Sequence, residues 1–174
     1  MGTQYKSLKA EDIEFIKEQK VFFVASSSGK EVNLSPKGYE CLKIIDSSTM
    51  LYMDYPGSGD RTARDIRDNG QVTLMFTSFT ETPKILRIFC KGELIERHTK
   101  EFLDAAGSFK ETNPAVIRRF IRYRVYAVET SCGQSVPYMQ YSGERDSLRN
   151  WAIKKSLDNT IDTYIKDHLE PPEL

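Results

Sequence analysis

The sequence predicts a mainly β domain in which mostly antiparallel strands close into a small barrel flanked by helices. Three observations support this class. Runs of strand character follow one another between residues 21 and 129, and turn residues separate them. Helical patterns fill both ends of the chain. A length of 174 residues suits one domain, with the barrel at about residues 20–130 and a C-terminal loop and helices at 131–174.

Strand patterns account for the middle of the chain. Each is a compact or alternating apolar run bounded by Gly, Pro, Asn, Asp or Ser. The tight turns SSGK and DSS join the first four runs in pairs, which predicts two β-hairpins. Gly92 lies inside the longest run and is expected to mark a β-bulge where that strand bends. The expected strands are residues 21–26, 31–35, 41–46, 49–55, 71–79, 85–98 and 121–130.

Helical patterns lie before, between and after these strands. A short helix after residue 60 is expected to turn Ala63, Ile66 and Arg67 inward, and Gly70 ends it. Pro114 stands in the first turn of a later helix, where proline is tolerated. The other expected helices are residues 10–20, 100–109, 113–120, 144–157 and 159–169.

Composition excludes several classes of function. The chain carries 25 basic and 25 acidic residues, and this balance argues against nucleic-acid binding. Its apolar runs are far shorter than the ~20 residues of a membrane span, and its first residues contain no apolar signal core. Cys41, Cys90 and Cys132 are widely spaced without a CxxC pattern. We therefore expect reduced thiols in the cytoplasm, with neither a disulfide framework nor a metal site.

Catalytic side-chain patterns are weak. The two histidines, His98 and His168, stand in polar surroundings, and no Ser-His-Asp or Cys-His arrangement is apparent. This disfavours a self-sufficient hydrolase. If the protein is an enzyme, we expect a cofactor to carry the chemistry.

The segment YPGSGDRTARDIRDNG, residues 55–70, has two interpretations. A helix N-terminus presents unpaired N–H groups, Ser58 and Thr62 can donate hydroxyl hydrogen bonds, and Arg61 can fork onto a phosphate. Alternatively, the segment is a plain turn capped by Asp60, with Arg61 solvated. The Asp60 carboxylate would also repel a phosphate, and neither GxxxxGKS nor GxGxxG is present. The residue chemistry alone leaves both interpretations open.

Two further segments are candidates for ligand contact. In NLSPKG, the side chains of Asn33, Ser35 and Lys37 alternate onto one strand face, where they can contact an anionic or carbonyl group. The same segment is also consistent with an ordinary strand end. In SVPYMQY, residues 135–141, aromatic and methionine side chains either cover a flat ligand or pack on the core.

The order of these motifs resembles a known family. VFFVASSSGKEVNLSPKG, then LYMDYPGSGDRTARDIRDNGQVTLMFTSF, then PKILRIFCKGELIE is similar to the pyridoxamine 5′-phosphate oxidase-like family of FMN-binding split barrels, over about residues 15–130. The resemblance implies a six-stranded antiparallel split β-barrel with peripheral helices. It also implies a homodimer with FMN bound at the dimer interface.

The resemblance implies an FMN-dependent oxidoreductase of unknown substrate, acting on a small molecule with NAD(P)H as a candidate electron donor. A related branch with a deazaflavin coenzyme shares the barrel, so that cofactor is an alternative. Two other functions remain. One is a non-catalytic module that holds FMN or another flat ligand such as haem. The other is an interaction protein whose barrel has lost its ligand.

The resemblance also assigns site residues. The helix-entry segment would hold the phosphate, the NLSPKG strand would flank the flavin ring and ribityl chain, and the LYMDY strand would pass under the ring. The SVP segment would reach the flavin edge from the other subunit. The implied cofactor-binding residues are Asn33, Ser35, Lys37, Met53, Asp54, Ser58, Arg61, Thr62, Ser135, Val136 and Pro137.

The chain departs from the family pattern at two places. True pyridoxamine phosphate oxidases have an arginine–lysine pair where this chain has Arg61 and Thr62, so Lys37 must supply the second positive charge. Their C-terminal substrate motif, an arginine and a histidine, has no match in HLEPPEL. Oxidation of pyridoxamine phosphate is therefore not expected.

Overall fold

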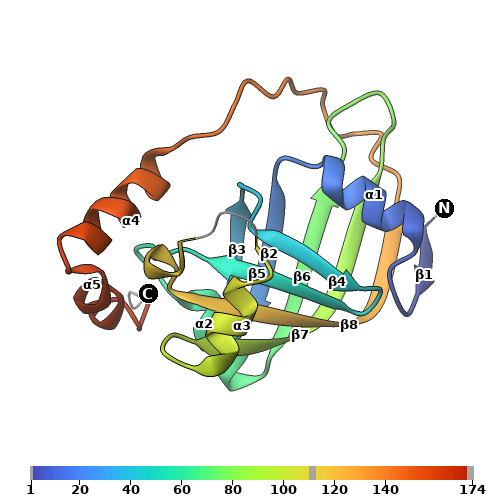
Figure 1. Cartoon of the computed structure of the whole chain (residues 1–174). Coiled ribbons are helices and arrows are strands. Elements are labelled where there is room, and N and C mark those ends of the chain that lie inside the picture. The colour runs from blue at the N-terminus through green and yellow to red at the C-terminus, as the bar shows by residue number, and fades with distance from the viewer. Residues whose placement is uncertain (1, 110–112, 172–174) are drawn as a thin grey trace.

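The computed structural model describes residues 2–109 and 113–171. Within them, eight strands form one mostly antiparallel sheet with helices around it (Figure 1). Met1 and residues 172–174, which the predicted domain includes, lie outside the described residues. The strands are β1 (Thr3–Tyr5), β2 (Phe22–Ser27), β3 (Val32–Lys37), β4 (Leu42–Asp46), β5 (Thr49–Asp54), β6 (Gln71–Thr77), β7 (Ile85–Glu96) and β8 (Arg119–Ser131).

The helices lie in four groups along the chain, one of which, α3 with η1, lies between β7 and β8. α1 precedes the β2–β3 hairpin, α2 connects β5 to β6, and α4 and α5 follow a long extended segment after β8 (Figure 1). None of the helices in the described ranges is long and apolar enough to cross a membrane. The bounds are α1 (Ala10–Glu18), α2 (Arg61–Asp68), α3 (Lys100–Ala106), the 3-10 helix η1 (Pro114–Val116), α4 (Ser147–Leu157) and α5 (Ile161–Asp167).

The sheet has the strand order β3-β2-β6-β7-β8-β5-β4. β8 pairs with β7 along its length, and its other edge pairs with β5 over residues 119–124 and with β1 over residues 128–130. Every predicted strand is present, with ends shifted by a few residues. The sheet has eight strands where the resemblance implied six. One additional strand, β1, is too short to show a period in sequence and is defined by its pairing with β8.

The predicted bulge at Gly92 is wrong. The register of the β7–β8 pair shifts between Phe89 and Cys90, where Tyr126 is the extra residue of β8. This extra residue reverses the alternation of β8, so Val128 is buried after the shift rather than Ala127. A single inserted residue changes which face each following side chain occupies, and nothing in the local sequence marks it.

Gly92 has a packing role instead. It lies under α2, and an added Cβ would stand 2.6 Å from Ile66 Cδ1 and 2.8 Å from Ile66 Cγ1. Ile66 belongs to the buried core. The glycine therefore allows α2, which packs on β2, β6 and β7, to approach the sheet closely.

We expect Gly92→Ala to lower the free energy of unfolding by about 1–3 kcal/mol, because the methyl group overpacks a filled core. Gly57→Ala is the matched control, since a Cβ there meets nothing within 4 Å. Urea unfolding of both variants measures the difference. An equal effect of the two substitutions would show that α2 accommodates the methyl group.

Two helix predictions also differ from the structure. The helix expected over residues 113–120 is only the short η1, because β8 begins at Arg119 and pairs there with both Glu96 and Asp54. In α2, Arg67 is exposed and Asp65 is buried, although Ala63 and Ile66 face inward as predicted. In both segments, contacts with distant parts of the chain override the conformation and the inward face that the local sequence favours.

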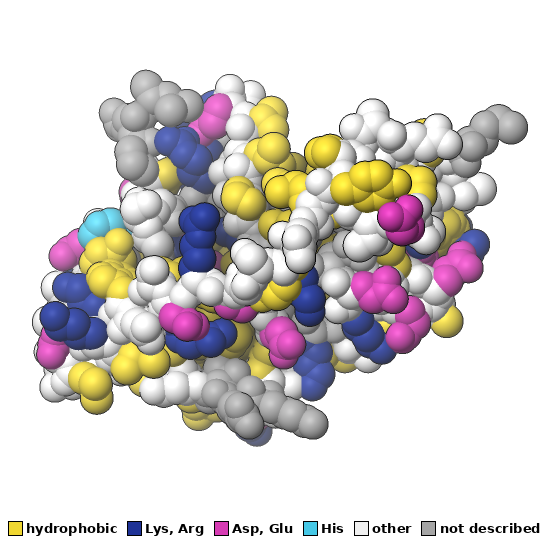
Figure 2. All heavy atoms as spheres, turned by 90° about the horizontal axis from the view of Figure 1, so that it is seen from above, with side chains coloured by type: hydrophobic (Ala, Val, Ile, Leu, Met, Phe, Trp, Pro, Cys, Tyr) yellow, Lys and Arg dark blue, Asp and Glu magenta, His cyan; other side chains and the backbone are white. Residues whose placement is uncertain are grey.

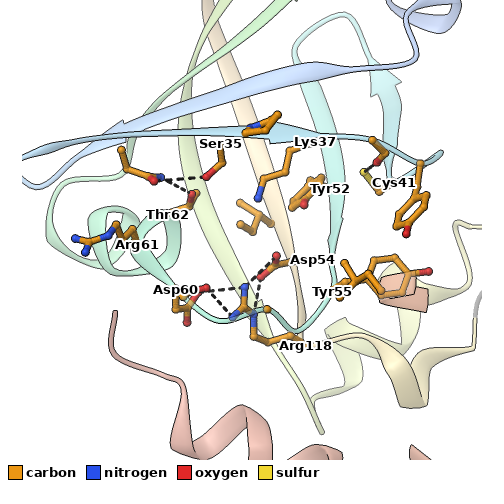
Figure 3. A pocket seen from close by; sticks show the side chains of 18 of the residues that line it. Ser35, Lys37, Cys41, Tyr52, Asp54, Tyr55, Asp60, Arg61, Thr62 and Arg118 are labelled. Atoms are coloured by element: carbon orange, nitrogen blue, oxygen red, sulfur yellow. Dashed lines mark hydrogen bonds and ion pairs between the residues drawn. The ribbon is translucent and has the colours of Figure 1, made fainter. Parts of the chain in front are cut away.

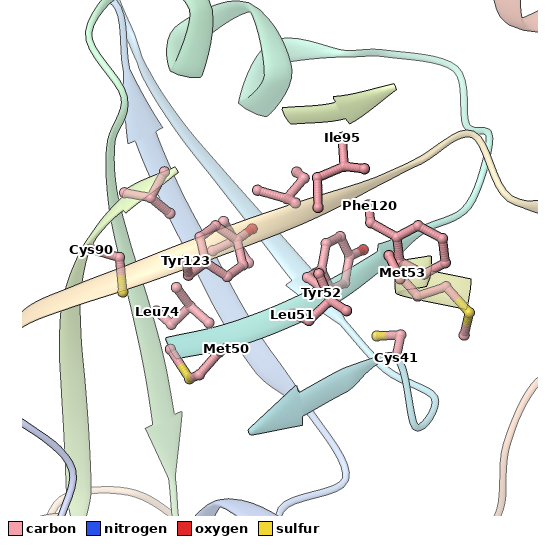
Figure 4. Close-up of a cluster of buried hydrophobic side chains, with 14 of the residues drawn as sticks. Cys41, Met50, Leu51, Tyr52, Met53, Leu74, Cys90, Ile95, Phe120 and Tyr123 are labelled. Atoms are coloured by element: carbon pink, nitrogen blue, oxygen red, sulfur yellow. The ribbon is translucent and has the colours of Figure 1, made fainter. Parts of the chain in front are cut away.

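The core includes side chains on both faces of β5, whose residues are all buried. Figure 4 shows side chains of β5, β6, β7 and β8 meeting in this core, with the Tyr52 and Tyr123 rings side by side. Their ring centroids are 6.3 Å apart. Phe22 stacks on Phe76 at 5.2 Å. This packed core fixes the strands that carry the candidate site.

Candidate functional site

A cavity of about 390 Å³ lies between β3, β5, the loop after β5 and the start of α2 (Figure 3). Its volume falls within the ~300–1,000 Å³ typical of small-molecule sites. The sequence-predicted residues that line it are Asn33, Ser35, Lys37, Asp54, Ser58, Arg61 and Thr62. The fold thus brings together the NLSPKG strand and the helix-entry segment.

The other predicted residues do not line this cavity. Side chains alternate along β5, so Tyr52 and Asp54 face the cavity while Met53 points to the opposite face, near Phe120 (Figures 3 and 4). Met53 therefore does not line this cavity, and its predicted contact with the cofactor stays a prediction. Ser135, Val136 and Pro137 lie after β8 and were assigned to the partner subunit's site, which a single chain does not test.

Hydrogen bonds tie β3 to the start of α2. Asn33 Nδ2 donates to Thr62 Oγ1 at 3.0 Å and to Ser26 Oγ at 3.1 Å. Ser26 Oγ in turn donates to Asp65 Oδ2 at 2.7 Å, and Arg64 holds the other oxygen of this fully buried carboxylate. This network explains why Asp65 faces inward. It orients Asn33 and Thr62 before any ligand arrives.

Arg61 is not the solvated arginine of the plain-turn interpretation. Its Nη1 donates to Glu31 Oε1 at 2.7 Å, and its side chain is 22% exposed. Glu31 also accepts from Arg64. The Arg64 hydrogen bond, followed by the charges of both arginines, holds the pKa of Glu31 below its usual value. A phosphate at the helix entry would share Arg61 with this carboxylate.

Asp60 has a different role from the two that the sequence suggested. Its side chain makes no capping hydrogen bond, is 3% exposed, and accepts from Arg119 Nη1 at 2.6 Å. Burial raises the pKa of Asp60, and the Arg119 hydrogen bond and the nearby Arg118 charge oppose that rise. Because the positive charge of Arg119 compensates the Asp60 carboxylate, the predicted repulsion between Asp60 and a phosphate is largely removed.

Asp60 belongs to a larger cluster of buried charges below the cavity. Arg118 donates to both oxygens of Asp54, at 3.0 and 3.2 Å, and Arg119 Nε donates to Glu96 Oε2 at 3.2 Å. Figure 3 shows Arg118 between Asp54 and Asp60. We call Asp54, Asp60, Arg118 and Arg119 the Asp–Arg cluster. Sequence reasoning missed its arginines, although an Arg-Arg pair opening an apolar strand is a visible signal.

Lys37 differs from the two arginines of the cavity in its electrostatic environment. Its side chain points into the cavity (Figure 3), and its Nζ lies 5.9 Å from the Tyr52 ring centroid. Over the described ranges, Lys37 takes part in no ion pair, whereas Arg61 and Arg118 are both paired with carboxylates. An ammonium group without a carboxylate partner is available to an anionic or carbonyl group of a ligand.

The opposite end of the cavity is aromatic. Tyr39 and Tyr55 meet edge to face with centroids 5.9 Å apart, and Leu148 of α4 also lines the wall. Cys41 lies there as well, and burial raises its pKa to about 12, so its thiol stays protonated and unreactive at neutral pH. Within residues 2–109 and 113–171, no group of three or more His, Cys, Asp or Glu could hold a metal ion.

The family model for pyridoxamine 5′-phosphate oxidase matches residues 8–132. The chain belongs to this family. The family assignment made from the order of motifs is confirmed, and all the residues that line the cavity except Leu148 lie in the matched range.

A curated relative and two solved structures illustrate the range of the pyridoxamine 5′-phosphate oxidase family and its fold. The family protein ustO of Aspergillus flavus is 33% identical over 139 residues, covering 78% of this chain and 56% of that protein. The chain thus spans about half the length of this curated relative. Among solved structures, HupZ of Group A Streptococcus superposes with a TM-score of 0.57 at 18% identity, covering 76% of this chain and 99% of that one.

HutZ, the heme storage protein of Vibrio cholerae, superposes with a TM-score of 0.50 at 17% identity, covering 73% of this chain and 97% of that one. At these identities the structural likeness shows the fold alone. The fold is therefore a mostly antiparallel sheet with flanking helices of the pyridoxamine 5′-phosphate oxidase type.

Proposed function

We propose that this chain is an FMN-binding, oxidoreductase-like protein that binds the cofactor in the cavity between β3, β5 and α2. Lys37 carries the proposal, because its ammonium group points into the cavity without a carboxylate partner among the described residues. The proposal includes the whole chain as one FMN-binding domain and the closure of the sheet into a split β-barrel.

Each part of the cavity has a role in this proposal. Thr62 and the first N–H groups of α2 would bind the phosphate together with Arg61. Asn33 and Ser35 would contact the chain between phosphate and ring, and Lys37 would contact the ring system. When bound, FMN supplies hydride transfer. The protein orients the cofactor through the β3–α2 hydrogen bonds and closes the cavity floor with the Asp–Arg cluster.

Partners and substrate are part of the proposal. We propose a homodimer with FMN at the interface, where Ser135, Val136 and Pro137 reach the cavity of the other subunit. Exposed apolar side chains support such an interface: Val32 and Leu34 on β3 are 78% and 63% exposed. Figure 2 shows hydrophobic side chains exposed on the upper face of the molecule. The substrate is a small molecule, with NAD(P)H as candidate donor.

The purified protein should bind FMN at least about tenfold more tightly than riboflavin, because only FMN offers a phosphate for charged hydrogen bonds. A visible spectrum and a titration of flavin fluorescence measure both affinities. Mass spectrometry of released cofactor separates FMN from a deazaflavin. A preparation that stays colourless after addition of FMN would overturn the proposal.

A second function is a flavin-binding module without turnover. It is favoured because the cavity carboxylates Asp54 and Asp60 are held in ion pairs and Cys41 stays protonated, so none of them is an available acid or base. A haem version has less support, since neither His98 nor His168 lines the cavity. A bound flavin that NAD(P)H does not reduce without oxygen would favour the module over the enzyme.

A further inference from the structure

We infer that the hydroxyl of Tyr123 is a further ligand-binding group of this cavity and donates a hydrogen bond to an acceptor atom of the flavin ring system. The inference rests on the proposed function and adds a residue from β8 that the family resemblance does not supply. Tyr123 is fully buried, lines the cavity wall, and has no hydrogen-bond partner for its hydroxyl within the described residues.

The unpaired hydroxyl sets Tyr123 apart from an ordinary core tyrosine. Buried polar atoms are almost always hydrogen-bonded, and a buried tyrosine usually finds a partner for its O–H. The other buried side-chain atoms without a partner in the described ranges belong to residues that do not line the cavity: Ser28, Thr77, Arg97 and Arg119. A phenylalanine would pack the same space, so packing alone does not explain the hydroxyl.

The surroundings indicate which kind of atom the hydroxyl would meet. The Tyr123 ring lies beside the Tyr52 ring, with centroids 6.3 Å apart. The ammonium group of Lys37 lies over the Tyr52 ring. Burial raises the pKa of Tyr123 well above its ordinary value, so the hydroxyl keeps its proton and acts as a donor. The Tyr123 hydroxyl and the Lys37 ammonium group are therefore both hydrogen-bond donors on this side of the cavity. Carbonyl oxygens and unprotonated ring nitrogens of a flavin are acceptors of the matching kind.

The phosphate of FMN would be bound by other residues, because its proposed partners Arg61 and Thr62 belong to α2. The hydroxyl of Tyr123 should therefore act on FMN and riboflavin alike. This separates its contribution from that of the phosphate-binding residues. It also makes the inference testable apart from the proposed phosphate site.

The test is Tyr123→Phe, measured in two ways. We expect the Kd for FMN and for riboflavin to rise by the same factor, about three- to tenfold, as one neutral hydrogen bond is lost. We expect the ligand-free variant to unfold at the same urea concentration as the wild type or a higher one, because the substitution removes an unpaired polar atom. Tyr126→Phe is the control on the same strand: its hydroxyl bonds Gln71 at the surface, and both affinities should stay unchanged.

Each outcome decides the question. Equal flavin affinities of wild type and Tyr123→Phe would overturn the inference and leave the proposed function intact. A ligand-free variant that is less stable or fails to fold would show that the hydroxyl serves the fold, and would also overturn it. A loss for FMN but not for riboflavin would place the hydroxyl at the phosphate, against the inference. A wild type that takes up no flavin would overturn the proposed function and this inference with it.

Discussion

Arg119→Met is expected to lower the free energy of unfolding by about 3–5 kcal/mol, because it leaves a buried carboxylate without its direct partner. Arg119 is fully buried and donates to Asp60 at 2.6 Å. After the substitution, the nearest guanidinium to Asp60 is Arg118, at 3.6 Å. Methionine keeps much of the side-chain volume of arginine. The lost stability therefore reflects the missing positive charge and not a cavity in the core. Urea unfolding of the ligand-free protein at pH 7 measures it.

Arg124→Met is the matched control for this prediction. Arg124 lies on the same strand, its side chain is 50% exposed, and it pairs with Glu93 at 3.4 Å. A surface pair of this kind contributes about 0–1 kcal/mol. The double variant Arg119→Met, Asp60→Asn should recover part of the loss, because no uncompensated carboxylate remains. Equal effects of the two arginine substitutions would contradict the role assigned to the Asp–Arg cluster.

The stability deficit of Arg119→Met should also depend on pH. Burial already raises the pKa of Asp60, and Arg119 opposes that rise. Without the arginine, the folded-state pKa of Asp60 moves further above its unfolded value. The folded variant then binds the proton more tightly than the unfolded chain, so lowering the pH stabilises it relative to the wild type. The deficit should therefore shrink as the pH falls below 7, in unfolding experiments at a series of pH values.

Arg61→Ala is expected to weaken FMN binding by about 1.5–3 kcal/mol, about ten- to hundredfold in Kd, because a charged hydrogen bond to the phosphate is lost. Riboflavin affinity should not change. Arg67→Ala is the control in the same helix, since Arg67 is exposed and pairs with Glu96 at 3.3 Å. Flavin fluorescence gives both dissociation constants. An unchanged FMN affinity of Arg61→Ala would remove this residue from the site.

Glu31→Gln tests the same site with a substitution that is expected to strengthen FMN binding. Glu31 holds Arg61 at 2.7 Å in the ligand-free chain and competes with a phosphate for it. The neutral amide should release the arginine and tighten FMN binding severalfold, again with no effect on riboflavin. The pKa of Glu31 is lowered, so the carboxylate competes throughout the neutral range. Weaker FMN binding by Glu31→Gln would show that the ion pair positions Arg61 instead of competing for it.

Much of the site was predictable because its parts are local. Asn33, Ser35 and Lys37 share a face through the two-residue period of a strand, and Thr62 follows Arg61 at a helix entry. Their meeting was predictable from the order of the motifs, which is that of the family, and in the structure Asn33 bonds Thr62. Met53 lies outside the cavity lining for a reason that is also local: Asp54 faces the cavity, so its neighbour in the strand faces away.

The sequence by itself determined the strands, the α2 entry and the family, because periodicity, turn chemistry and motif order act over a few residues at a time. Only the tertiary structure decided how the charges pair. Asp60 meets Arg119 across 59 positions, and Arg61 meets Glu31 across 30. Only the folded sheet shows that the Tyr123 hydroxyl has no partner among the described residues. A local pattern shows that a side chain is buried or charged, but its partner is set by strands that the sheet brings together from distant parts of the chain.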